Sequence, residues 1–312
     1  MKKIFIDGKT GTTGLRIYER LGMRDDISII TLPDEKRKDI HYRKQALNEC
    51  DIAFLCLPDD AAREAVSLIE NKNTVVIDTS TAHRTNPDWA YGFPELSTEL
   101  ENRIKNSGRI AVPGCHASGF ISLVYPLIEK KVLDKSTLLS CFSITGYSGG
   151  GKRMIAEYED GKRDLLFGYP RQYALTQQHK HLPEMKAITG IDNEPVFCPV
   201  IGDFYSGMQV SVPLFAKQLI CSVEEIAEIY KEKYDAEIVK YDSTIDSTSP
   251  LSAGILSGTD AMRISVFGSG ERIVLCSAYD NLGKGASGAA IECLNIVLGT
   301  DKTKGLKLTS ES

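Results

Sequence analysis

The 312-residue sequence lacks the patterns that mark several large classes of protein. None of its apolar runs approaches the roughly 20 residues that a helix needs to cross a bilayer. The run after Lys2 and Lys3 ends at Asp7, well short of a secretory signal core. An excess of positive charge is also missing: the formal net charge of -5 argues against binding nucleic-acid phosphates or anionic lipid. We therefore expect a cytoplasmic protein with a small-molecule partner, no nucleic-acid partner and no membrane partner.

The eight cysteines lack the paired spacing of a zinc site or a disulfide framework. They lie singly along the chain, with no Cys-x-x-Cys pair, so most are expected to be buried small apolar residues. Their positions are Cys50, Cys56, Cys115, Cys141, Cys198, Cys221, Cys276 and Cys293.

The length is typical of two packed domains, and an apolar content of 42% provides for a core in each. In the first third of the chain, short apolar runs alternate with polar helical stretches. This alternation predicts an α/β fold with a parallel sheet covered by helices on both faces. The expected strands are Lys3–Gly8, Ile27–Leu32, Ile52–Leu57, Val75–Ile77 and Ile110–Val112, and the expected helices are Thr13–Leu21, Lys36–Asn48 and Asp59–Glu70.

After a boundary near Pro113 the pattern changes to longer strands with an occasional helix, which predicts an α+β domain. An apolar helix follows a Gly-Ala-Ser-Gly sequence within Gly285–Leu298, and residues 301–312 are expected to form a loose tail. The expected strands are Leu138–Thr145, Pro195–Ile201, Gln209–Phe215, Met262–Phe267 and Arg272–Ala278, and the expected helix is Ser222–Tyr234.

Gly8, Gly11 and Gly14 form a Gly-x-x-Gly-x-x-Gly turn between the first strand and the first helix. Bare backbone can approach a pyrophosphate there, and the N–H groups at the helix start, around Thr12 and Thr13, can point at it. The alternative is an ordinary turn whose glycines adopt positive φ. The position at the first strand–helix junction favours dinucleotide binding.

Lys36 and Arg37 belong to a basic cluster, completed by Lys38, that follows the second strand. Such a cluster suits the 2′-phosphate of NADP. Asp34 keeps NAD open, since an acidic residue in this region can bind the ribose hydroxyls. The cluster could also be a solvated helix start. The sequence favours NADP.

Cys115 follows Pro113-Gly114 where a strand ends and an apolar helix is expected to begin. A thiol at a helix N-terminus has a lowered pKa, so this cysteine is the candidate nucleophile. A cysteine packed at a domain junction is the alternative. Pro126 is expected to shorten or kink the helix.

His179 and His181 lie two residues apart in a segment expected to be extended, with Glu184 three residues beyond the second. An imidazole can exchange protons near neutral pH, and Glu184 could fix its tautomer. We favour His181 as the acid/base, with His179 an open alternative. A metal site is less favoured, because zinc-binding histidine pairs usually lie four apart on a helix.

Three further loops carry candidate ligand contacts. A glycine-rich loop with Ser148 and Lys152 could bind a substrate phosphate or carboxylate. At the end of a parallel strand, Ser80 could contact cofactor or substrate, and Arg84 could pair with an anion. Asn281 precedes the last helix and could orient a nicotinamide amide. Ordinary surface loops or helix-packing turns are the alternatives.

Together these segments resemble the N-acetyl-γ-glutamyl-phosphate reductases, in particular the shorter form of that family, from Lys2 to about Gly299. The motifs that carry the resemblance are Gly8-Lys-Thr-Gly-Thr-Thr-Gly14, Asp78-Thr-Ser-Thr-Ala-His-Arg84, Pro113-Gly-Cys115, Ser148-Gly-Gly-Gly-Lys152, His179-Lys-His-Leu-Pro-Glu184 and Asp280-Asn-Leu-Gly-Lys-Gly-Ala-Ser-Gly288. One departure is His116-Ala117-Ser118, where the family often has Tyr-Pro-Thr after the nucleophile.

The resemblance implies an NADP-binding Rossmann-like domain over residues 1–113 and 286–300 and a catalytic domain of the semialdehyde dehydrogenase type over 114–285. It also implies a homo-oligomer, dimer or tetramer. Cys115 would attack N-acetyl-γ-glutamyl phosphate, and NADPH would reduce the thioester to N-acetylglutamate semialdehyde in arginine biosynthesis. A reductase of a related acyl phosphate, such as aspartyl phosphate, and a non-catalytic NADP-binding redox sensor are the alternatives.

Overall fold

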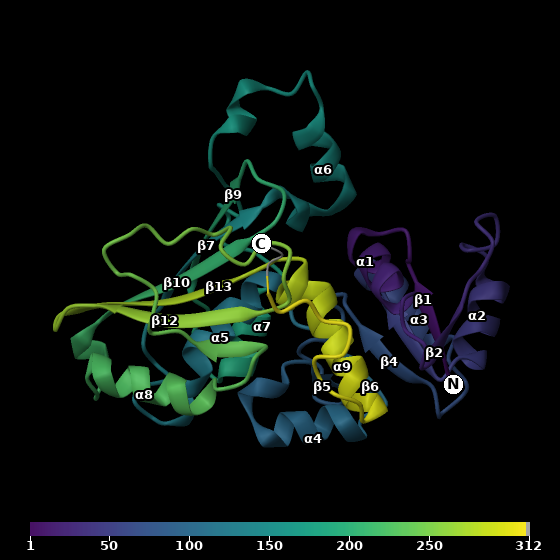
Figure 1. Ribbon diagram of the computed structural model, residues 1–312, viewed down its shortest axis with the longest axis horizontal. Helices are drawn as coiled ribbons and strands as arrows, with labels where there is room; N and C mark the ends of the chain where they lie inside the picture. Colours follow the sequence, from purple (N-terminus) through teal and green to yellow (C-terminus); the bar gives the residue numbers. More distant parts are fainter. Residues whose placement is uncertain (310–312) are drawn as a thin grey trace. The chain divides into compact units, whose positions relative to one another are not determined.

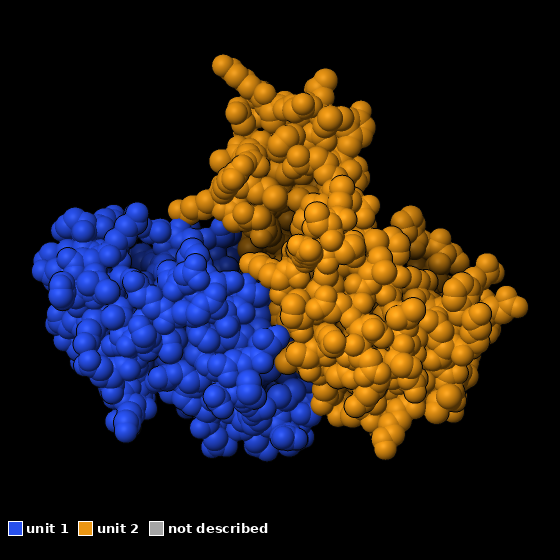
Figure 2. Space-filling model, turned by 180° about the vertical axis from the view of Figure 1, so that it is seen from behind, with its two compact units in different colours: residues 1–113, 286–306 blue, residues 114–285, 307–312 orange. Residues whose placement is uncertain are grey.

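The structure is a computed structural model that describes residues 1–309. The chain divides into two compact units, coloured separately in Figure 2. Unit 1 comprises Met1–Pro113 and Ala286–Leu306, and unit 2 comprises Gly114–Gly285 with the described residues from Lys307 onward. Among residues 1–309, no helix combines the length and the apolar character that a membrane span requires.

Unit 1 contains a six-stranded sheet in the order β2-β1-β3-β4-β6-β5, and every strand pair is parallel. The expected α/β fold with a parallel sheet is therefore confirmed (Figure 1). The strands are β1 (Lys2–Asp7), β2 (Ile27–Ile30), β3 (Ile52–Leu55), β4 (Val75–Asp78), β5 (Ala90–Tyr91) and β6 (Arg109–Ala111), and the helices are α1 (Thr12–Leu21), α2 (Ile40–Glu49), α3 (Asp59–Ser67), α4 (Thr98–Asn106) and α9 (Gly288–Leu298).

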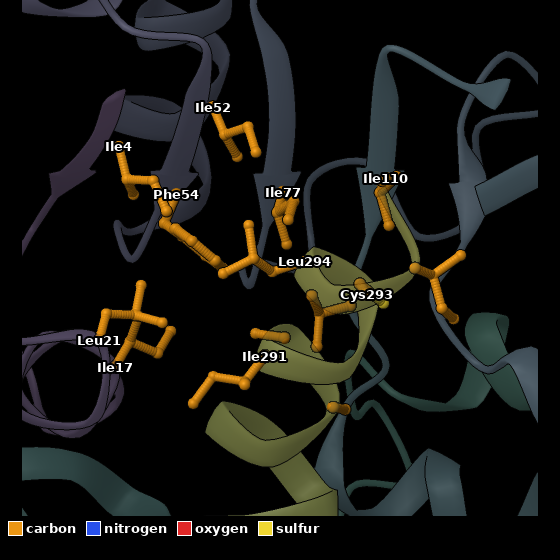
Figure 3. Packing of buried hydrophobic residues seen from close by; sticks show 14 of the residues in the cluster. Ile4, Ile17, Leu21, Ile52, Phe54, Ile77, Ile110, Ile291, Cys293 and Leu294 are labelled. Atoms are coloured by element: carbon orange, nitrogen blue, oxygen red, sulfur yellow. The ribbon is translucent and has the colours of Figure 1, made fainter. Parts of the chain in front are cut away.

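Strand β3 is buried at every residue and so buries both faces, as its unbroken apolar sequence requires. On β1, Ile4 and Ile6 pack in the cluster that contains α1 and α9, whereas Phe5 packs in the cluster that contains α2 and α3. Figure 3 shows Ile291 and Leu294 of α9 in the first of these clusters. Helix α9 is apolar on nearly all sides, and so it is buried within unit 1 although it is the last helix in sequence.

Helix α2 starts at Ile40 rather than at Lys36 as expected. The side chain of Asp39 accepts a hydrogen bond from the N–H of His41 and so caps the helix there. The basic cluster therefore lies in the turn that precedes α2.

Unit 2 is built on a seven-stranded sheet in the order β11-β12-β13-β10-β7-β9-β8. Helix α5 packs on β10 and β13, and α8 packs on β11 and β12, so the helices cover one face (Figure 1). The expected α+β architecture is confirmed, with two helices, α6 and α7, that the sequence did not indicate. The strands are β7 (Ser140–Gly146), β8 (Arg171–Gln172), β9 (Val196–Gly202), β10 (Met208–Phe215), β11 (Val239–Tyr241), β12 (Met262–Gly268) and β13 (Arg272–Tyr279), and the helices are α5 (Cys115–Glu129), α6 (Gly151–Glu159), α7 (Leu182–Thr189) and α8 (Val223–Lys233).

Pro126 does not end α5, which continues to Glu129. A proline lacks the N–H that would bond to the carbonyl oxygen four residues earlier, here that of Ser122. The hydroxyl of Tyr234 donates a hydrogen bond of 2.7 Å to this oxygen instead. The cost of the proline is therefore reduced by a tyrosine at the C-terminal end of α8.

Residues 301–307 are not the loose tail that the sequence predicts. The side-chain amide of Asn295 donates to the carbonyl oxygens of Lys302 and Lys304. The main chain of Lys307 accepts from the N–H of Asp260 and donates to its carboxylate. Of the expected tail, residues 310–312 lie outside the described residues.

Candidate active site

The glycine turn of unit 1 joins β1 to α1 with no room for side chains. Gly8 has φ +85°, and a Cβ there would lie 2.2 Å from the carbonyl oxygen of Cys56. A Cβ on Gly14 would lie 2.5 Å from the carbonyl oxygen of Gly8. The N–H of Gly11 donates to that same oxygen at 2.9 Å. Only glycine therefore permits this close approach between the turn and the helix.

The start of α1 has the features expected of a phosphate site. Gly11 is the N-cap residue and supplies no side-chain acceptor for the first N–H groups of the helix. The hydroxyl of Thr12 is buried and has no hydrogen-bond partner among the described residues. Thr13 follows it in the first turn. A phosphate oxygen would satisfy both the helix N–H groups and this hydroxyl, so these residues fit a dinucleotide pyrophosphate.

A cavity of about 370 Å³ extends from the glycine turn to the segment after β2. Asp34, Arg37 and Lys38 line it. Arg37 is oriented by a hydrogen bond of 2.8 Å from its guanidinium to the hydroxyl of Thr10. The ammonium of Lys36 lies 4.3 Å from the centre of the Tyr42 ring, and Lys36 does not line the cavity. The basic side chains that line the cavity are Lys9, Arg37, Lys38 and Arg43, so of the expected pair Arg37 lines it and Lys36 does not.

Arg43 also lines this cavity, and the sequence analysis did not identify it. It is buried on α2, where it donates to the carboxylates of Asp7 (3.0 Å) and Glu64 (2.6 Å). Burial raises the pKa of Asp7, and the charge of Arg43 opposes that rise. The sequence signal for Arg43 was a cationic residue within a weakly amphipathic helix that directly follows the second strand.

The loop after β4 is held by its own side chains. Asp78 accepts hydrogen bonds from the N–H and the hydroxyl of Ser80, and its carboxylate lies 2.6 Å from Nδ1 of His83. The buried guanidinium of Arg84 donates to main-chain carbonyl oxygens, one of them that of Val112. Ser80 and Arg84, which the sequence suggested as candidate ligand contacts, thus stabilise the loop at the carboxyl end of β4.

In unit 2, Cys115 is the first residue of α5, with Gly114 as the N-cap. Its side chain is half-buried. The N–H of Gly114 donates to the carboxylate of Glu184 at 2.8 Å, and the hydroxyl of Tyr279 donates to the carbonyl oxygen of Cys115 at 2.6 Å. These contacts hold the thiol at the positive end of the helix, which favours the thiolate.

The two histidines of the His-x-His segment lie in a turn, not in the extended segment that was expected. The N–H of Leu182 donates to the carbonyl oxygen of His179, and His181 has helical φ and ψ as the N-cap residue of α7. Their ring centroids are 4.8 Å apart, and both rings lie within 6 Å of the ring of His116. Burial lowers the pKa of His179 to about 4. The imidazoles of His179 and His181 therefore lie beside that of His116, the residue that follows Cys115.

Glu184 links the histidine segment to the turn that precedes Cys115, through the bond to Gly114. It is buried on the first turn of α7. The sequence suggested that Glu184 could fix the tautomer of an imidazole, and it did not indicate the contact with the N–H of Gly114.

His116 is buried and hydrogen-bonded through both ring nitrogens. Nδ1 lies 2.6 Å from the hydroxyl of Ser143, and Nε2 lies 2.6 Å from the hydroxyl of Tyr173. Burial lowers the pKa of His116 to about 3. Sequence reasoning identified neither Ser143, a buried residue in an alternating strand, nor Tyr173, which lies in an irregular segment.

The glycine loop after β7 brings Ser148 and Asn281 together. The hydroxyl of Ser148 accepts from the Asn281 amide at 3.0 Å, and the amide oxygen of Asn281 accepts from the N–H of Gly207. Asn281 therefore stabilises the loop, where the sequence suggested a contact with nicotinamide. Lys152 lies exposed in the first turn of α6.

Within residues 1–309, no group of three or more histidine, cysteine or carboxylate side chains is arranged to hold a metal ion. The metal interpretation of the histidine segment therefore has no geometric support.

Two family models match the chain. Residues 115–281 match the dimerisation domain of semialdehyde dehydrogenase, and residues 27–104 match its NAD-binding domain.

Curated proteins resemble the chain over nearly its whole length. A protein of Rhizobium meliloti (strain 1021) is 42% identical over 305 residues, which cover 95% of this chain and 98% of the relative. A protein of Brucella ovis is 43% identical over 306 residues, which cover 95% and 99%. Both relatives are named N-acetyl-gamma-glutamyl-phosphate reductase.

Solved structures of aspartate semialdehyde dehydrogenases share the fold at low sequence identity. The Vibrio cholerae enzyme complexed with ASA has a TM-score of 0.69 and 16% identity, and covers 96% of this chain and 98% of its own. The enzyme from Francisella tularensis has a TM-score of 0.71 and 15% identity, with coverages of 96% and 100%. The Candida albicans enzyme with NADP has a TM-score of 0.66 and 16% identity, with coverages of 96% and 98%. These likenesses support the two-part fold alone.

Proposed function

The chain belongs to the N-acetyl-γ-glutamyl-phosphate reductase family, and from that premise we propose that it reduces N-acetyl-γ-glutamyl phosphate to N-acetylglutamate semialdehyde and phosphate, with NADPH, in arginine biosynthesis. The observation that carries the proposal is 42–43% identity over 95% of the chain, with Cys115 placed as the first residue of a helix.

Unit 1 binds the cofactor in this proposal. The residues that would hold the pyrophosphate are Gly8, Gly11 and Gly14, with the N–H groups of Thr12 and Thr13. Arg37, with Lys38 beside it in the cavity, would hold the 2′-phosphate. We assign no direct cofactor contact to Lys36, Ser80 or Asn281, since the first lies outside the cavity and the other two stabilise loops. When bound, NADPH supplies the hydride that reduces the thioester carbonyl.

Unit 2 carries the acyl chemistry. The Cys115 thiolate attacks the acyl carbon of the substrate, a C–S bond forms, and the C–O bond to phosphate breaks with release of inorganic phosphate. The resulting thioester accepts hydride more readily than a carboxylate would, so one difficult step becomes two easier ones. After reduction the C–S bond breaks, and the aldehyde and the thiol are released.

The sulfur that leaves needs a proton, and we assign its delivery to His181. His179, whose pKa burial lowers to about 4, is neutral at physiological pH and is the alternative partner. Glu184 accepts a hydrogen bond from the N–H of Gly114, the residue before Cys115, and so holds the histidine segment in a fixed position relative to Cys115.

Substrate anions bind at the glycine loop after β7. Ser148 is buried and held by Asn281, which leaves the exposed ammonium of Lys152 and the loop N–H groups to contact a carboxylate or phosphate. Arg84 acts indirectly, through the main-chain carbonyl oxygens that it binds.

We further propose a homo-oligomer formed through the uncovered face of the unit 2 sheet. Phe142, Ile144, Val196 and Phe215 are large apolar residues of β7, β9 and β10 whose side chains are exposed on the described chain. An apolar patch of this kind is typical of an interface. The dimerisation-domain match covers the same strands.

The eight free thiols suit the reducing cytoplasm, where we place the enzyme.

The decisive assay runs the reaction in reverse, with phosphate-dependent reduction of NADP by N-acetylglutamate semialdehyde. We expect turnover with NADP, much less with NAD, and none in Cys115→Ser, whereas Cys221→Ser, another half-buried cysteine of unit 2, retains it. Faster turnover of aspartate semialdehyde would instead identify a related acyl-phosphate reductase. NADPH binding without turnover of either aldehyde would indicate a redox sensor.

A further inference from the structure

A hydrogen-bonded chain of three side chains lies directly beside the nucleophile in unit 2. It runs from the Ser143 hydroxyl to Nδ1 of His116, and from Nε2 of His116 to the Tyr173 hydroxyl, with both distances 2.6 Å. His116 follows Cys115 in the first turn of α5. The direction in which each of these two hydrogen bonds is donated decides whether the Tyr173 hydroxyl is free to donate a hydrogen bond to Cys115.

The burial of Ser143 fixes the first link. Its side chain is fully buried, and its only side-chain hydrogen bond within residues 1–309 is the one to His116. A buried hydroxyl proton without an acceptor is costly, whereas an under-used lone pair costs less. Ser143 therefore donates its proton to Nδ1 of His116.

The neutrality of His116 fixes the second link. The ring is buried, and burial together with the neighbouring His179 lowers its pKa to about 3, so it stays neutral at physiological pH. A neutral imidazole has one donor nitrogen and one acceptor nitrogen. Because Nδ1 accepts from Ser143, Nε2 carries the hydrogen and donates it to the oxygen of Tyr173.

Tyr173 then keeps its own proton for another acceptor. Within residues 1–309 the hydroxyl is hydrogen-bonded only to Nε2 of His116, which in this arrangement cannot accept. Burial, and next the charge of Cys115, raise the pKa of Tyr173, so the phenol keeps its proton.

We propose that Ser143 and His116 are positioning residues that turn the hydroxyl proton of Tyr173 toward the sulfur of Cys115. The Tyr173 hydroxyl stabilises the thiolate before attack. Its catalytic importance rests on the proposed function, but the arrangement itself does not depend on any substrate. No proton transfer along the three side chains is required. Only the direction in which each hydrogen bond is donated matters.

The first test reads the tautomer of His116 directly in the full-length protein at pH 7. Histidine is labelled with ¹⁵N, and the His116 signal is assigned by its loss in His116→Gln. We expect the protonated nitrogen to be Nε2 and the unprotonated one Nδ1. A ring protonated at Nδ1 overturns the proposal, whatever the enzyme's activity.

The second test measures the rate of alkylation of Cys115 by iodoacetamide as a function of pH, without substrate, with Cys115→Ser as the background. A lost donor to the thiolate raises the apparent pKa of Cys115 by about one pH unit in Ser143→Ala and Tyr173→Phe. Tyr169→Phe, an exposed tyrosine of the same segment, leaves the profile unchanged. An unshifted profile in both test variants overturns the proposal. Failure of the acyl-phosphate assay alone counts against the proposed function, because neither measurement here involves substrate.

Discussion

The hydroxyl of Tyr279, at the end of β13, donates a 2.6 Å hydrogen bond to the carbonyl oxygen of Cys115, in the first turn of α5. Both the ring and its partner belong to unit 2, and the ring is fully buried. The bond therefore fixes the start of α5 against the sheet of unit 2.

Tyr279→Phe is expected to lower the free energy of unfolding by about 1–2 kcal/mol, because the Cys115 oxygen loses a partner in a buried place. Urea unfolding followed by circular dichroism measures this loss. Tyr205→Phe, at a ring that is 41% exposed, serves as the control and should change stability by less than half as much. Equal losses in the two variants would contradict a specific role for the Tyr279 hydroxyl.

Gly14→Ala is expected to weaken NADPH binding at least tenfold. The new methyl group would lie 2.5 Å from the carbonyl oxygen of Gly8, so the turn must move away from α1 and its N–H groups. Titration of NADPH fluorescence measures Kd. Gly108→Ala is the matched control in unit 1, since a Cβ there meets nothing within 4 Å. The prediction is wrong if both variants bind NADPH like the parent.

Arg37→Ala is expected to reduce affinity for NADPH by about ten- to a hundredfold and to leave NADH nearly unaffected, because a charge-assisted bond to the 2′-phosphate is lost. Competition titrations with both cofactors measure the ratio. Lys44→Ala removes an exposed cation of α2 that pairs with Glu70, and should change neither affinity. A parallel loss of NADPH and NADH binding would show that Arg37 acts on the fold of the turn instead.

The sequence predicts the elements whose signal is local. A strand formed by a continuous apolar run, such as Ile52–Leu57, buries both of its faces. Glycine is required at position 14 because the helix approaches the preceding turn closely there. The glycine turn and the helix start at Cys115 were therefore found from a few neighbouring residues.

Contacts between distant residues could not be predicted in this way. Glu184 bonds the N–H of Gly114, and Asn281 bonds Ser148, because tertiary packing brings together segments far apart in sequence. Local spacing suggested other partners for both. The His-x-His segment was expected to be extended, yet the start of α7 at Leu182 turns the chain there, and a two-residue spacing does not reveal such a cap.

The buried imidazole of His116 predicts an acid-sensitive fold. Its pKa is about 3 in the folded protein and about 6.5 in an unfolded chain, so below pH 6.5 the unfolded chain binds a proton that the folded protein does not. The stabilisation from His116 is complete above about pH 6.5 and decreases as the pH falls toward 3. The free energy of unfolding should therefore decrease by up to about 1.4 kcal/mol per pH unit from this residue alone.

Urea unfolding at pH 7, 6, 5 and 4.5 tests this, with His116→Gln as the variant. Carboxylates titrate over the same range, so the difference between variant and parent is the informative quantity. The slope should be shallower in His116→Gln and unchanged in His41→Gln, where the histidine is exposed. If His116→Gln keeps the slope of the parent, some other group causes the acid sensitivity.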